Sequence, residues 1–130
     1  MNVIMLQKHE YPAHGEPDKR GKSVLSSGRN HIVGYVANLF VDEEEKRVRF
    51  FDVVPQDWLG RERKHHHHLI PIEAQISREE SIRRDSFDDV ELRVDKETVE
   101  SSPTLPPSLD AAEFSELQEA VRRHYEAALR

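Results

Sequence analysis

Two neighbouring stretches of the chain carry apolar residues at the spacing of β-strands, and a short charged run separates them. In the first, from His31 to Val41, one side holds Val33, Tyr35, Ala37, Leu39 and Val41, and the other holds Ile32, Val36 and Phe40. Such a strand has little water on either face. The run from Asp42 to Lys46 is too charged to be buried, and the chain then returns through the largely apolar residues 47–54. The pattern predicts a long buried β-hairpin of a small barrel or sandwich, which is typical of domains that bind rather than catalyse.

Shorter apolar alternations predict the remaining strands. Their apolar positions are Ile70, Ile72, Ala74 and Ile76 in one strand and Val90, Leu92 and Val94 in another. We also expect short strands at 23–26 and near Ile82. Pro71 cannot donate a backbone hydrogen bond, so it marks an edge, a bulge or a corner of the sheet.

Residues 109–130 carry the signals of an amphipathic helix. Asp110 is a good N-cap with Glu113 three residues later, and Leu109 and Phe114 occupy the positions of a hydrophobic staple. Apolar or amphipathic residues then recur at helical spacing, at Phe114, Leu117, Val121, His124 or Tyr125, and Ala128. The face formed by Phe114, Leu117 and Val121 is either a core-packing stripe or a surface for a partner, such as the seam of a homodimer.

About five to six strands followed by one helix predict a mainly β fold, a small β-barrel with a C-terminal α-helix. Residues 1–22 carry prolines and glycines among charges, and we expect them to form a flexible N-terminal segment. The barrel is then expected over 23–108. The helix is expected over 109–130, packed on the barrel or on a partner.

Composition narrows the function classes. The 130 residues carry a net charge of −6, which disfavours nucleic acid as a partner because neutralising phosphates needs a surplus of basic residues. There is no cysteine, so neither a disulfide framework nor a thiolate metal site is predicted. No apolar run reaches the roughly 20 residues of a membrane span, and we expect a cytoplasmic protein. Because no nucleophile elbow, phosphate-binding glycine loop or zinc spacing is present, we expect neither an enzyme nor a cofactor.

Three segments, taken in order, resemble the PRC-barrel family. They read VGYVANLFVDEEEKRVRFFDV (33–53), LIPIEA (69–74) and VELRVDKETVESSPTLPPS (90–108), and an acidic helix ending near a tyrosine follows them. The hairpin resembles the opening hairpin of the family, and the Pro-Thr-Leu stretch is similar to that of the cytoplasmic domain of the photosynthetic reaction centre H subunit. The resemblance covers about residues 23–125 and implies a PRC-type barrel.

The resemblance implies a non-catalytic interaction or assembly module whose relatives lie at a cytoplasmic membrane face in photosynthetic bacteria. Three features depart from the H subunit: no N-terminal membrane helix, Asn38 where aspartate is common, and an end at Arg130 soon after the tyrosine. We therefore expect a soluble stand-alone relative that binds a protein partner, with peripheral association with a membrane complex as an alternative. A homodimer is also expected, since a small barrel with an amphipathic helix often leaves an apolar patch to cover.

The hairpin tip carries the first candidate for chemistry. By the resemblance, Asp42, Glu45 and Arg49 match positions that help to deliver protons to a quinone in the photosynthetic members. Clustered carboxylates suit such a relay because like charges raise one another's pKa. This reading would make the chain an accessory proton- or electron-transfer component. The alternative is a solvated turn with an ordinary surface ion pair.

Four consecutive histidines, His65, His66, His67 and His68, form the second candidate. In a strand, alternate residues share a face, so His65 with His67, or His66 with His68, could ligate a metal. Two ligands do not complete a site, and a polar hairpin loop is the alternative. A third hypothesis is a pH-sensitive patch that becomes cationic near pH 6.5 and approaches an acidic partner.

Overall fold

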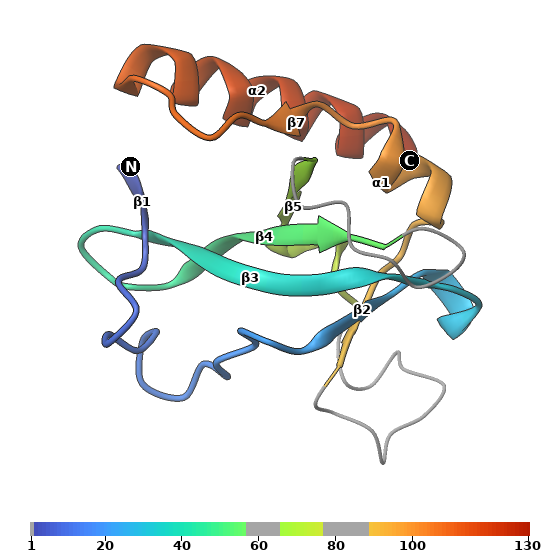
Figure 1. The fold of residues 1–130 in the computed structure, drawn as a ribbon, viewed down its shortest axis with the longest axis horizontal. Coiled ribbons are helices and arrows are strands. Elements are labelled where there is room, and N and C mark those ends of the chain that lie inside the picture. The colour runs from blue at the N-terminus through green and yellow to red at the C-terminus, as the bar shows by residue number, and fades with distance from the viewer. Residues whose placement is uncertain (1, 57–65, 77–88) are drawn as a thin grey trace.

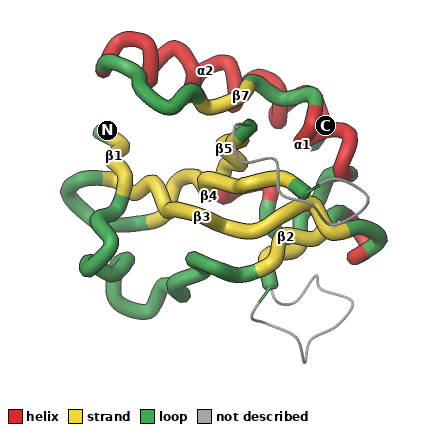
Figure 2. Tube along the Cα trace, viewed as in Figure 1, coloured by secondary structure: helices red, strands yellow, loops and turns green. Residues whose placement is uncertain are grey.

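The computed structural model describes residues 2–56, 66–76 and 89–130, and all structural statements concern these residues. Figure 1 shows the path of the chain, and Figure 2 separates strands from helices. The strands are β1 (Val3–Met5), β2 (Ser23–Leu25), β3 (Ile32–Asp42), β4 (Val48–Pro55), β5 (His67–Pro71), β6 (Val90–Glu91) and β7 (Thr104–Leu105). The helices are the 3₁₀ turns η1 (Ser27–Arg29) and η2 (Ile72–Ala74) and the α-helices α1 (Lys96–Glu100) and α2 (Ala111–Ala128).

The described strands belong to one curled sheet in the order β6-β2-β3-β4-β5-β7, and β1 pairs with the far end of β3. The pairs are antiparallel except for β2 with β6. The residues after β6 link β2 to the turn η2 that follows β5: Leu92 N–H donates to the carbonyl of Leu25, and Arg93 N–H donates to the carbonyl of Ala74. The sheet is not a closed ladder, but these bonds give it the form of a barrel. The predicted mainly β barrel with a C-terminal helix is confirmed.

The predicted hairpin is formed by β3 and β4. The residues of β3 do not alternate strictly between its two faces, as the sequence pattern predicted, because the strand contains a bulge. Val36 lies opposite Val53 and Asn38 lies opposite Asp52, so Ala37 is an extra residue in a β-bulge. Leu39 pairs with Phe51, two residues before Val53 on the same face of β4. The bulge therefore puts Val36 on the face of Leu39 and Val41, and it leaves Asn38 and Phe40 together on the opposite face.

Gly34 allows the two arms of the hairpin to approach closely. A Cβ at this position would overlap the carbonyl oxygen of Val54 and lie 2.8 Å from the Cα of Pro55. Only glycine fits here, because the obstacle is backbone and cannot rotate away.

The strand predicted through Ile70, Ile72, Ala74 and Ile76 is wrong in its bounds. The strand β5 begins earlier, at His67, and ends at Pro71, where the chain enters the 3₁₀ turn η2. Pro71 thus lies at a corner, one of the three places expected for it, because its ring fixes φ and it offers no N–H to a longer ladder. The strand at Val90 is confirmed and short, and the strand expected near Ile82 lies outside the described residues.

The short helix α1 was not predicted. Asp95 caps it, since its carboxylate accepts the N–H of Thr98 at 2.8 Å, and Val99 is fully buried. The segment after it is extended, as expected, and forms β7 beside β5. The backbone of α1 also supports the C-terminal helix, because His124 Nε2 donates to the carbonyl of Thr98 at 2.7 Å.

The predicted C-terminal helix and its capping box are confirmed. The Asp110 carboxylate accepts the N–H of Glu113 at 2.8 Å, and the Glu113 carboxylate accepts the N–H of Asp110 at 3.3 Å. In Figure 1, α2 lies across one face of the sheet. Two residues of α2, Val121 and Tyr125, are buried. Among the described helices, none has the length and apolar character needed to cross a membrane.

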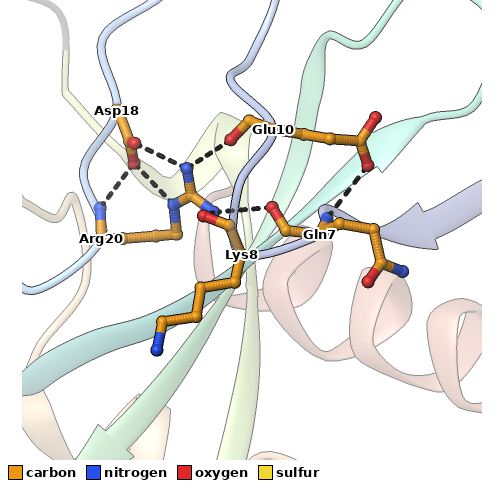
Figure 3. A network of polar contacts seen from close by, with 5 residues as sticks. All are labelled: Gln7, Lys8, Glu10, Asp18 and Arg20. Atoms are coloured by element: carbon orange, nitrogen blue, oxygen red, sulfur yellow. Dashed lines mark hydrogen bonds and ion pairs between the residues drawn. The ribbon is translucent and has the colours of Figure 1, made fainter.

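Residues 2–22, which were expected to form a flexible segment, make several contacts with the barrel. Leu6 is buried and its N–H donates to Leu39, while the N–H of Gly21 donates to Val36. The guanidinium of Arg20 joins the turns of this segment, as Figure 3 shows. It donates to the Asp18 carboxylate at 2.7 Å and to the carbonyls of residues 7, 8 and 10. The bond from Arg20 lowers the pKa of Asp18.

Candidate functional site

The tip of the hairpin is a charged turn held by several hydrogen bonds. The Asp42 carboxylate accepts the N–H groups of Glu44 at 2.9 Å and Glu45 at 3.1 Å. Lys46 adopts a left-handed φ of 58°, and its N–H donates to the carbonyl of Asp42. The N–H donors, first that of Glu45, lower the pKa of Asp42. Asp42 therefore stays ionised at neutral pH and stabilises the turn.

The three residues matched to a proton relay lie on this tip but do not form one chain of contacts. Arg49 approaches Asp42, with Nη2 3.8 Å from Oδ2. Glu45 is exposed and instead approaches Arg47 at 3.7 Å. The structure therefore describes a capped turn with two separate ion pairs, and proton delivery by Asp42, Glu45 and Arg49 stays a prediction.

The described histidines of the His65–His68 run point to different surroundings, because consecutive residues of β5 face opposite ways. His66 is exposed, and His67 bonds to Asp52. His68 is buried, and its Nδ1 lies 2.9 Å from the hydroxyl of Ser102. Burial is the main cause that lowers the pKa of His68.

This arrangement corrects the polar-loop alternative for His67 and His68, which belong to a strand. Their placement follows from pairing, since His68 lies opposite Val53 of β4 and Thr104 of β7. His65 lies outside the described residues. Within the described part of the chain, no three His, Cys, Asp or Glu side chains gather as a metal site would require. Metal binding by the run stays a prediction.

The stripe of α2 packs on the barrel. Val121 is fully buried, and Phe114 and Leu117 are half-buried against the same core. The rings of Phe114 and Phe40 lie 5.2 Å apart, and the guanidinium of Arg122 lies 5.6 Å from the centre of the Phe50 ring. These contacts match the core-packing alternative and place Val121 out of reach of a partner.

A cavity of about 580 Å³ lies between the sheet and the first turns of α2. Its walls come from β1, from the Asn38 and Phe40 face of the hairpin, from the segment after β7, and from the start of α2. The apolar walls include Met5, Phe40, Leu105, Leu109 and Phe114. Met5 is 43% exposed, so the wall formed by β1 reaches the surface of the protein.

Three polar side chains meet in the wall of this cavity formed by the sheet. Asp52 is only 2% exposed, and its Oδ1 lies 2.7 Å from Nδ1 of His67. Its Oδ2 accepts the Nδ2–H of Asn38 at 2.9 Å. Because a carboxylate only accepts hydrogen bonds, the Nδ1 atom of His67 carries the proton of this bond. The Asn38, Asp52 and His67 cluster thus fixes the tautomer and the orientation of the imidazole.

Sequence reasoning missed this cluster, although two signals point to it. Asp52 is a lone carboxylate in the apolar run Phe50–Val54, where a charged side chain needs a buried partner. Asn38 stands at the position where the resemblance leads one to expect aspartate. The sequence did not indicate that His67 is the partner, since the pairing of β4 with β5 decides it.

The comparison with protein families agrees with this geometry. The PRC-barrel domain matches residues 17–96, which is more than half of the chain. The chain belongs to the PRC-barrel family. A comparison with curated proteins gave no match. PRC-barrel domains are generally non-enzymatic and serve in protein interactions, and the hairpin, β5 and β6 all lie inside the matched range.

Proposed function

We propose that this PRC-barrel is a non-catalytic module that binds and assembles with another protein. The observation that carries the proposal is the match to a family of interaction barrels over residues 17–96. The chemistry of the described polar residues agrees with it. Asp42 caps a turn and His68 bonds to Ser102, so each has a structural partner.

The hairpin tip is the surface that we propose for the partner. Glu43, Glu44 and Glu45 are consecutive and exposed, and the Asp42 cap holds their backbone in one conformation. A preformed acidic tip loses little conformational entropy on binding and attracts a basic surface. The stripe of Phe114, Leu117 and Val121, the other candidate for a partner surface, is packed against the barrel.

The resemblance to the H subunit makes this proposal more specific. In that reading, the partner is a membrane protein complex and the module acts at its cytoplasmic face. A cytoplasmic location, a link to photosynthesis and a homodimer belong to the same proposal. Capture of the partner from the membrane fraction rather than from the soluble fraction would support it.

The test is affinity capture with the purified chain, followed by titration of each captured protein after separate purification. One variant carries Glu43→Lys, Glu44→Lys and Glu45→Lys. A matched control carries Glu116→Lys, Glu119→Lys and Glu126→Lys on the exposed face of α2, with the same change in charge. We expect the tip variant to bind at least about tenfold more weakly, with a salt-dependent affinity, and the control to bind like the native chain.

Two results would contradict the proposal at different levels. If the native chain enriches no protein beyond those found with an unrelated barrel as bait, the interaction role is wrong. If both variants bind a purified partner as tightly as the native chain does, the role stands and the tip is the wrong surface.

A further inference from the structure

We propose that the cavity between the sheet and the start of α2 binds a small, neutral, mostly apolar molecule that carries one hydroxyl group. In this site, the hydroxyl donates a hydrogen bond to Nε2 of His67. The inference is independent of the protein-binding role, because the hairpin tip is not part of the cavity wall.

Size and lining point to a small molecule. A cavity of about 580 Å³ lies within the range of roughly 300–1,000 Å³ that is usual for sites of drug-sized ligands. Most of its wall is apolar, with aromatic rings from Phe40 and Phe114. Of the polar side chains in the described lining, Asn38, Asp52 and His67 converge on the sheet side, and Asp110 lies at the start of α2. This combination of a largely apolar wall and a few fixed polar groups is typical of ligand sites.

The charges of the cavity argue against an anionic ligand. Two carboxylates line it, Asp52 and Asp110, and no lysine or arginine belongs to the described lining. The positive end of α2 would favour an anion, but the Asp110 cap already occupies it. A cation is also disfavoured, since both oxygens of Asp52 already accept hydrogen bonds and Asp110 accepts the N–H of Glu113.

The choice of a hydroxyl group on the ligand follows from the hydrogen bonding of the His67 ring. Its Nδ1–H is committed to Asp52, and in the neutral ring the other nitrogen is then an acceptor with an available lone pair. Nε2 makes no hydrogen bond within the described part of the chain, and the His67 side chain, 29% exposed, is part of the cavity wall. Asp52 holds the ring through Nδ1 and is itself held by Asn38, so the acceptor is oriented before any ligand arrives.

Three probes of one shape separate the hydroxyl from the rest of the ligand: 4-phenylphenol, its methyl ether, and biphenyl-4-carboxylate. Binding is measured at pH 8 by calorimetry and by backbone amide NMR shifts. We expect saturable one-to-one binding of the phenol with shifts at β1, at β5 and at the start of α2. The ether should bind about three- to tenfold more weakly, as the loss of one hydrogen bond predicts, and the carboxylate more weakly than the phenol.

Two variants with matched controls localise the binding. Ala111→Trp fills the cavity from the first turn of α2, whereas Ala112→Trp adds the same side chain at an exposed neighbour outside the lining. His67→Ala removes the acceptor, whereas His66→Ala changes an exposed neighbour. We expect Ala111→Trp to abolish binding of the phenol. We expect His67→Ala to reduce its affinity to that of the ether and to leave the affinity of the ether unchanged, a comparison made on variants with native amide spectra.

Several outcomes would overturn the proposal. Equal affinity for the phenol and the ether would remove the hydroxyl contact, and tightest binding of the carboxylate would show an anion site. Binding that does not saturate, or binding that Ala111→Trp leaves intact, would show that the probes bind outside this cavity. A chain that sediments as a dimer, and that Ala111→Trp but not Ala112→Trp converts to a monomer, would show that a second copy fills the cavity.

Discussion

Three adjacent histidines of the PRC-barrel show that a shift of one position along the chain changes the surroundings of a side chain. His66 is exposed, His67 completes the Asp52 cluster, and His68 is buried against Ser102. Three histidines thus have three different environments. His66 lies just before β5, whereas His67 and His68 are neighbours in the strand and face opposite ways. A run of identical residues in the sequence is therefore not one chemical site.

The buried His68 predicts a pH dependence of stability. Burial lowers the pKa of His68 in the folded chain below the ordinary value of about 6.5, so the unfolded chain binds the proton first. The free energy of unfolding should therefore fall as the pH drops below about 6.5, and this loss should stop growing below the folded pKa. Urea unfolding at several pH values between 8 and 5 measures it.

The control for this prediction is a neighbour with the same chemistry. His68→Gln should remove this part of the pH dependence, whereas His66→Gln should keep it, because His66 is exposed. Parallel pH profiles for the native chain and His68→Gln would contradict the prediction.

At the scale of elements, the hairpin and α2 hold the barrel together in different ways. The bulge at Ala37 gives the hairpin two distinct faces, with Leu39 toward the core and Asn38 and Phe40 toward the cavity. The helix α2 covers this second face, with Val121 and Tyr125 buried and Phe114 beside Phe40. The cavity exists where the helix and the bulged face do not fill the space between them.

The packing of α2 predicts how much stability is lost when a buried side chain of the helix is shortened. Val121→Ala removes two buried methyl groups at a fully buried position and should lower the free energy of unfolding by about 2 kcal/mol. Glu116→Ala, on the exposed face of the same helix, should change it by less than about 0.5 kcal/mol. Chemical denaturation measures both changes. Equal losses in the free energy of unfolding for the two variants would show that packing of Val121 against the barrel does not stabilise the protein.

At the scale of the whole molecule, the N-terminal residues belong to the folded unit. The strand β1 extends the edge of β3 and forms one wall of the cavity, and Arg20 joins the loops between β1 and β2. The guanidinium donates to the carbonyl of Glu10 at 2.7 Å, and it is a second donor to the carbonyl of Gln7, which also accepts the N–H of Glu10.

Removal of this side chain predicts a local loss of order. Arg20→Ala removes the side-chain donor to the carbonyl of Glu10 and one of the two donors to the carbonyl of Gln7, so amide hydrogen exchange over residues 7–20 should rise by about tenfold, the effect of a charged hydrogen bond. Exchange in β3 and β4 should change little. Arg123→Ala, with a side chain that is 77% exposed, serves as the control. Unchanged exchange over 7–20 would contradict the role of Arg20.

The sequence alone determined the elements with strong local signals. The apolar hairpin around a charged turn and the capped helix after Asp110 follow from alternation and from N-cap chemistry, which depend on neighbours within a few residues. The short helix α1 had such a signal in Asp95 and was missed because five residues show no helical period. The end of β5 at Pro71 was also within reach, since proline restricts a ladder by itself.

Only the tertiary structure decided which distant residues meet. The Ala37 bulge shifts the register by one residue, and alternation in one strand holds no information about its partner. Asp52, His67 and Asn38 come from three strands, and the α2 helix that closes the cavity lies more than forty residues beyond His67. Local pattern fixed the barrel and its helix, whereas strand register and helix docking created the candidate site.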